Sequence, residues 1–216
     1  MRYSLNQIEH TVRKAVRGCG FSWGLAEEAG RAVRWLEMTG LDGIELLTRH
    51  LPQLDGSEGV GQSMVIGDGC LRRTDGLLSP LAAGPTVGDL LYGVDQGVVQ
   101  LEQVAAPMLL LGYAGNLAMQ TGHSVVVTLA EREILTTAQG LSDCNVIWPK
   151  TADMITITKN SNPPTGLSVT NPAVIQAREV DQRTMGLLDQ YVHRTYVEAT
   201  EASRLSGAGA GVSDND

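Results

Sequence analysis

Three helical patterns follow one another at the start of the chain and constrain its fold more than any other feature. Ser4 and Gln7 have the spacing of a capping box, in which each side chain bonds the other residue's backbone at the start of a helix. Apolar residues then recur at helical spacing, and glycine or proline ends each run. We therefore predict helices over residues 4–18, 22–38 and 42–52, the last capped by Asp42 and closed by Pro52.

The rest of the chain alternates short apolar runs with turns rich in glycine, serine and aspartate. Residues 174–180 suit either a strand or a helix, and Asp181 begins an amphipathic helix that we expect to be long. The other predicted elements are helices at 86–92 and 107–120 and strands at 97–104, 124–129, 134–137, 145–148 and 154–158.

These elements predict an α+β fold. Helices do not alternate regularly with the strands, so a small mixed or antiparallel sheet is favoured over a doubly wound one. No linker divides the chain, so residues 1–216 are expected to form a single domain. In it, a three-helix unit (1–52) packs on the sheet-containing part (53–216), with the long helix near the C-terminus.

Glycine is the outlier in composition, with 25 of 216 residues, or about 12 % against a usual ~7 %. Ten of these glycines fall in residues 56–97 and three in residues 207–211. We expect unusual backbone geometry in these two segments. Both also contain or adjoin arginines, which makes them the first places to look for a binding site.

Charge and cysteine content exclude several classes of protein. The net charge of −8 and the absence of a basic tract argue against a nucleic-acid partner. The uncharged apolar stretch at 104–119 is shorter than the ~20 residues of a membrane-spanning helix, and the N-terminus has no signal-peptide pattern. Cys19, Cys70 and Cys144 are far apart and odd in number, which favours free thiols in a reducing cytoplasm. We therefore expect a cytoplasmic protein with no membrane partner.

Motifs for cofactors and metals are missing from the sequence. There is no Gly-Lys dipeptide, as a P-loop requires, and no complete GxGxxG. The four histidines are too scattered to suggest a metal site. We expect neither a cofactor nor a metal.

Arg72 and Arg73 form the first cluster of interest. They lie in a glycine-flanked segment and could hold a carboxylate or phosphate by paired hydrogen bonds. The alternative is a surface loop in which these arginines pair locally with aspartates, and surface pairs of that kind have little significance.

The second cluster lies near the C-terminus, at residues 196–211. Alternating glycine and alanine can expose successive backbone N–H groups to an anion, and Arg204 would add charge. Glu198 and Glu201 are the candidate catalytic residues for proton transfer. The alternative is a flexible tail. The candidate binding residues of both clusters are Arg72, Arg73, Ser203, Arg204, Ser206, Gly207, Gly209, Gly211, Asp214 and Asn215.

Both ends of the chain resemble a proteobacterial family of uncharacterised proteins, catalogued as domain of unknown function number 3726. The resemblance rests on Tyr3–Asn6, Phe21–Ala29, Arg194–Val197 and the segment from Glu201 to Asp216. Glu198 stands where that family's end motif would have proline. The resemblance implies a bacterial cytoplasmic protein and brings no established activity. The three-helix start also resembles that of malate/lactate dehydrogenases without a Rossmann domain, but their Asp-Ser-His-Gly segment has no counterpart here.

Two functions follow as hypotheses. The first is binding, or turnover, of a small anionic metabolite at the C-terminal segment, with Arg204 holding the anion. The alternative is a non-catalytic interaction or assembly protein, in which apolar helix faces form a homodimer or larger homo-oligomer.

Overall fold

The α+β class is confirmed by a computed structural model that describes residues 1–56, 64–67, 69–142, 148–160, 169 and 175–196. The helices are α1 (Leu5–Gly18), α2 (Trp23–Met38), α3 (Gly43–Leu54), α4 (Pro80–Tyr92), α5 (Leu109–Thr121) and α6 (Gln182–His193). The strands are β1 (Arg2–Ser4), β2 (Met64–Gly67), β3 (Cys70–Arg73), β4 (Gly97–Ala105), β5 (Ser124–Leu129), β6 (Arg132–Thr136), β7 (Thr151–Asn160) and β8 (Ala177–Glu179).

Most strands belong to a mixed six-stranded sheet in the order β2-β3-β4-β7-β5-β6. Only β3 and β4 pair in parallel among these neighbours, and the other pairs are antiparallel. A separate two-stranded sheet joins β1 to β8, with Arg2 opposite Glu179. The alternatives for residues 174–180 are thereby resolved in favour of a strand at 177–179.

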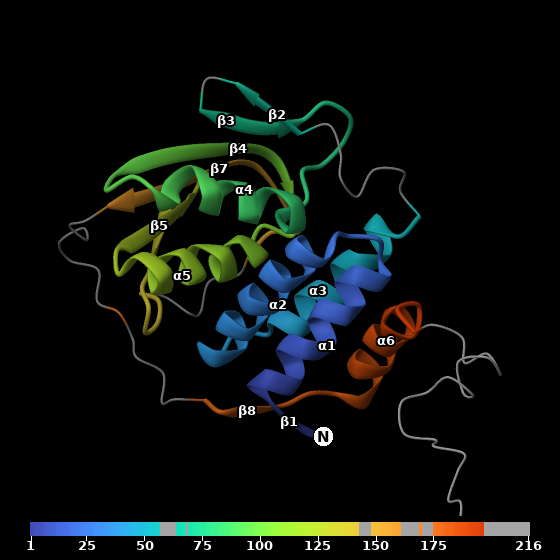
Figure 1. Cartoon of the computed structure of the whole chain (residues 1–216). Coiled ribbons are helices and arrows are strands. Elements are labelled where there is room, and N and C mark those ends of the chain that lie inside the picture. The colour runs from blue at the N-terminus through green and yellow to red at the C-terminus, as the bar shows by residue number, and fades with distance from the viewer. Residues whose placement is uncertain (57–63, 68, 143–147, 161–168, 170–174, 197–216) are drawn as a thin grey trace, which may run out of the picture.

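The helices form a layer on one side of the sheet (Figure 1). Helices α4 and α5 lie against the sheet through β4 and β5, and α2 packs on α5. Helix α1 packs on α2, and α6 packs on α1. The main contact of the N-terminal helices with the sheet-containing part therefore passes through α2 and α5. Helix α6 has 12 residues, fewer than the 14 of α1 and the 16 of α2, so it is not a long helix in this fold.

Close helix packing accounts for part of the glycine excess. A Cβ atom on Gly112 would overlap the Ala32 carbonyl of α2, and one on Gly115 would overlap the Trp35 ring. These two positions of α5 therefore allow α2 to approach its backbone. In the 56–97 segment the expected unusual geometry does occur, for example at Gly69 and Gly76, with φ of 76° and 98°.

The third helix begins and ends differently from the prediction. Asp42 makes no side-chain capping bond, and α3 continues through Pro52 to Leu54. Pro52 has no N–H to donate to the carbonyl of Thr48, so it removes one backbone hydrogen bond of α3 without ending the helix. The Asp42 carboxylate instead accepts a hydrogen bond from Arg178, whose Nε atom also donates to the buried Glu37 at 2.8 Å.

Two other predictions need correction. The helix predicted at 86–92 is the second half of α4, which begins at Pro80 behind an N-cap at Ser79. The strand predicted at 145–148 lies mostly outside the described residues, and Trp148 itself is not in a strand.

Candidate ligand-binding cleft

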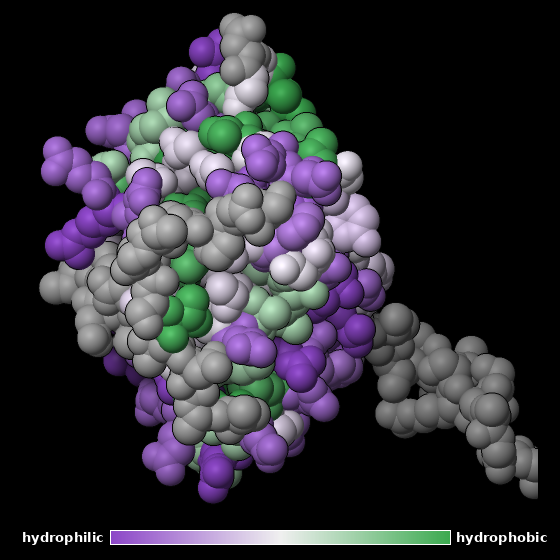
Figure 2. Space-filling view, turned by 90° about the vertical axis from the view of Figure 1, so that its left-hand side faces the viewer, coloured by the Kyte–Doolittle hydropathy of each residue, from purple (hydrophilic) through white to green (hydrophobic). Residues whose placement is uncertain are grey.

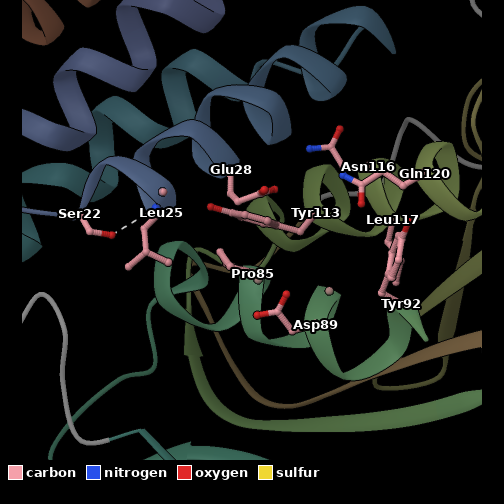
Figure 3. A pocket seen from close by; sticks show the side chains of 13 residues that line it. Ser22, Leu25, Glu28, Pro85, Asp89, Tyr92, Tyr113, Asn116, Leu117 and Gln120 are labelled. Carbon is pink, nitrogen blue, oxygen red and sulfur yellow. Dashed lines mark hydrogen bonds between the residues drawn. The ribbon is translucent and has the colours of Figure 1, made fainter. Parts of the chain in front are cut away.

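A cleft of about 370 Å³ opens where the first turns of α2 face α4 and α5 (Figure 3). Gly24, Gly84 and Gly88 are among its lining residues, so parts of the helices present no side chains there. The side chains that line the cleft are those of Ser22, Leu25, Glu28, Pro85, Asp89, Tyr92, Tyr113, Asn116, Leu117 and Gln120.

Tyr113 is a buried lining residue of this cleft. Its ring, on α5, lies directly against the backbone of Gly84 on α4, where a Cβ atom would overlap the ring. Glycine at position 84 therefore makes room for the aromatic side chain. In Figure 3, Tyr113 extends from α5 toward α2, and Glu28 and Asp89 lie on either side of it in this view.

Two buried polar atoms in the cleft lack a partner. The Tyr113 hydroxyl and Nδ2 of Asn116 make no hydrogen bond with the described residues, although the two residues are only 6 % and 7 % exposed. A buried polar group without a partner costs about 1–3 kcal/mol. Such groups are rare in folded proteins and call for an explanation, such as a bound molecule.

The electrostatics of the cleft are acidic. Glu28 and Asp89 contribute carboxylates, and no described lysine, arginine or histidine lines it. Glu28 also forms an ion pair with Arg31, which lies outside the cleft. Burial raises the pKa of Tyr113 far above its ordinary value, and the nearby charge of Glu28 raises it further. Tyr113 therefore remains a neutral hydroxyl that can donate a hydrogen bond.

Lys159 holds the α4 end of the cleft. Its side chain is buried, and Nζ donates to the carbonyls of Leu91, Tyr92 and Val94 at 3.0, 3.2 and 2.7 Å. These carbonyls lie at the C-terminus of α4, where a cation is favoured by the helix dipole. Lys159 thereby fixes the turn that carries Tyr92 at the cleft rim.

The sequence contained weak indications of these residues. Gly84 and Gly88 are four apart and so share a face of α4. Lys159 continues the alternation of Ile155 and Ile157, which indicates a buried position. The sequence did not distinguish Tyr113 from a core residue, because α5 is buried on nearly all sides.

The arginine pair predicted from the sequence lies elsewhere, on β3 in the edge hairpin. Neighbouring residues of a strand face opposite sides, so Arg72 and Arg73 do not point the same way. Arg72 is exposed, and Arg73 forms an ion pair with Asp75 at 3.0 Å. Neither arginine lines the cleft. The Arg73 pair is of the local kind expected from the alternative, while anion binding by either arginine stays a prediction.

The C-terminal candidate site lies outside the described residues and stays a prediction. It comprises Glu198, Glu201, Ser203, Arg204, Ser206, Gly207, Gly209, Gly211, Asp214 and Asn215.

Surface properties bear on the assembly hypothesis. The apolar faces of α1, α2 and α5 are buried within the chain, so a homodimer would use other surfaces. In Figure 2, apolar residues occupy several separate areas of one face, with hydrophilic residues between them. Large exposed apolar side chains in the described part of the chain include Trp23, Ile66 and Val98.

Among the described residues, no group of three or more histidines, cysteines or acidic residues is arranged to hold a metal ion. None of the helices in that part combines the length and apolar character needed to cross a membrane.

Comparison with known proteins gives little further guidance. Residues 3–65 match the model of a family described as "Protein of unknown function (DUF3726)", which supports the resemblance at the N-terminal motifs. No curated protein matches the chain. Among solved structures, the malate dehydrogenase from Entamoeba histolytica matches with a TM-score of 0.43 and 14 % identity. That match covers 63 % of this chain and 43 % of the dehydrogenase.

Proposed function

We propose that the protein binds a small organic amine in the cleft between α2, α4 and α5. The observation that carries this proposal is the pair of buried, unpartnered groups on Tyr113 and Asn116, lying in a cleft with two carboxylates. The volume of about 370 Å³ falls at the small end of the range of ligand pockets, roughly 300–1,000 Å³.

The chemical groups of the cleft define the ligand. An ammonium group would be attracted by Glu28 and Asp89, because hydrogen bonds between opposite charges are about twice as strong as neutral ones. A hydroxyl or carbonyl oxygen on the same ligand would accept from the Tyr113 hydroxyl and from Nδ2 of Asn116. The exposed ring of Tyr92 at the rim offers a face to the cation.

An anionic metabolite does not suit this cleft, since its charge would meet two carboxylates. The anion hypothesis therefore applies to the C-terminal segment around Arg204, where it remains a proposal. Assembly into a homo-oligomer is the alternative function. The bacterial, cytoplasmic setting implied by the family resemblance is part of the same proposal.

Calorimetric titration of the full chain tests the amine cleft. Ethanolamine and putrescine are titrated in parallel with glycolate and succinate, which have similar size and opposite charge. We expect at least one amine to bind and neither acid to bind in the cleft. Asp89→Asn should weaken the amine about tenfold, as should Tyr113→Phe, each equivalent to ~1.4 kcal/mol.

Two matched variants control for nonspecific effects. Asp189→Asn makes the same charge change on an exposed position of α6, and Tyr196→Phe removes an exposed hydroxyl. Both should bind the amine as the unmodified protein does. The proposal is wrong if neither amine binds the full chain, or if Asp89→Asn and Tyr113→Phe weaken binding no more than these controls.

A further inference from the structure

A second cavity, of about 360 Å³, lies beside α3 and shares no residue with the amine cleft. Its walls are largely apolar and come from α3, from the connection between β4 and α5, and from the segment before β7. The apolar lining consists of Leu46, Ala106, Met108, Trp148 and Pro149. The Ala106 N–H donates to the Lys150 carbonyl at 2.9 Å, which holds these last two segments together.

His50 provides a buried polar group in this cavity. The residue is 2 % exposed, and its Nε2 atom lies 3.0 Å from the Ser79 hydroxyl oxygen. That oxygen also accepts from the Leu81 N–H as the N-cap of α4, so its own proton can be donated to Nε2. In this arrangement the His50 ring proton is on Nδ1, which lies near the Gln53 side chain but makes no hydrogen bond of normal geometry with the described residues.

The charge of this cavity is opposite to that of the cleft. Arg49 and Lys150 are exposed residues of its lining, and no described carboxylate lines it. Arg49 also pairs with Glu45 on the same helix, whereas Lys150 forms no ion pair with a described carboxylate. Burial lowers the pKa of His50 to about 4, with Gln53 opposing the shift. His50 is therefore neutral near pH 7 and acts as a hydrogen-bond donor without charge.

We infer that this cavity binds a small aromatic carboxylate, with its ring against Trp148 and Met108 and its carboxylate toward Lys150, Arg49 and Nδ1 of His50. A half-buried tryptophan and a methionine suit an aromatic ring. The cations and the Nδ1–H supply the donors that a carboxylate requires. Volume alone would admit a ligand of either charge, so the charge of the lining decides the class. This inference is independent of the amine cleft.

Benzoate is the probe for this site, titrated into the full chain by calorimetry and followed by tryptophan fluorescence. Benzyl alcohol and benzylamine keep the ring and change the charged group, while inorganic phosphate keeps a negative charge without the ring. We expect benzoate to bind about tenfold more tightly than each of these three compounds. Its binding should change the fluorescence of the unmodified protein and leave that of Trp148→Phe nearly unchanged.

Substitutions of exposed residues test ligand binding without disturbing the fold. Lys150→Gln and Arg49→Gln should each weaken benzoate several-fold, while Arg132→Gln, an exposed residue at the start of β6, should not. The inference is overturned if benzoate fails to bind, if phosphate or benzylamine binds as well as benzoate, or if both cavity variants match Arg132→Gln. Failure of the amine titration would leave this result unaffected, because the two sites share no residue.

Discussion

The amine cleft and the His50 cavity have almost the same volume, about 370 and 360 Å³, and opposite charge. The cleft is formed between helices whose glycines leave parts of its wall without side chains. The cavity is formed by side chains of α3 and of two connecting segments. Each contains buried polar atoms without a partner, on Tyr113 and Asn116 in the cleft and on His50 in the cavity. Buried polar atoms without a partner can therefore suit ligands of opposite charge, depending on the charged residues around them.

The largest expected effect comes from adding one methyl group to the cleft wall. Gly84→Ala places a Cβ atom onto the Tyr113 ring, whereas Gly88→Ala, one turn later on the same wall, meets open space. We expect Gly84→Ala to lower the free energy of unfolding by about 3 kcal/mol through overpacking. Gly88→Ala should be neutral or stabilise α4 by up to about 1 kcal/mol. Urea denaturation of both variants measures the difference, and equal stabilities would contradict the close packing of Tyr113 on Gly84.

The second largest effect is the pH dependence of stability that His50 causes in the cavity. The folded-state pKa of His50 is about 4, against an ordinary value of 6.5, so the unfolded chain binds more protons between these values. Stability is therefore lost as pH falls from about 6.5 toward 4, and about 2 kcal/mol should be lost between pH 7 and pH 5 through this residue. His50→Gln should lack this contribution. Denaturation curves at pH 5, 6 and 7 compare the stability of the unmodified protein with that of His50→Gln. Parallel pH profiles of the two proteins would refute the predicted contribution of His50.

Removal of the Lys159 ammonium should weaken ligand binding in the cleft more than ligand binding in the cavity. Lys159→Met keeps the length of the side chain and leaves three carbonyls at the end of α4 without their donor. Two of these residues, Tyr92 and Val94, are exposed, so water replaces part of the loss and we expect a cost of about 1–2 kcal/mol. Amine binding should weaken because the Tyr92 turn loosens, while benzoate binding should be unchanged. If Lys159→Met weakened amine binding and benzoate binding equally, the substitution would disturb the whole fold and not the cleft alone.

The smallest expected effect is a gain in stability, not a loss. Tyr113→Phe keeps the ring on Gly84 and removes a buried hydroxyl that has no partner, so the free protein should become about 1 kcal/mol more stable. For a chain of this size the melting temperature should rise by roughly 2–4 °C. The same variant is expected to weaken amine binding. A fall in melting temperature without ligand would mean that the hydroxyl has a structural partner.

Features set by neighbouring residues were predictable from the sequence. The capping box of Ser4 and Gln7, the start of a helix at Asp181 and the end of α5 at Gly122 are all confirmed. Each depends on contacts within one helical turn, which the sequence displays directly. The mixed sheet was also predictable, because irregular alternation of helices and strands rules out a doubly wound order.

Features that depend on distant residues were not predictable. The Asp42 carboxylate had the spacing of a cap, yet it pairs with Arg178, which is far along the chain. The cleft brings together α2, α4 and α5, and nothing local indicates that the Tyr113 hydroxyl would lack a partner. The predicted anion site relied on adjacency in sequence, and adjacency in a strand separates Arg72 from Arg73 onto opposite faces.

The pairing of β1 with β8 has a consequence for the order in which the chain folds. Residues 2–4 pair with residues 177–179, and α6 packs on α1. During synthesis, α1 is complete long before the segment that covers its second side exists. Helix α1 therefore reaches its final packing only after nearly all of the described chain has been made. Because closure over such a long separation is slow, we expect early, shortened chains to depend on chaperones for protection of this surface.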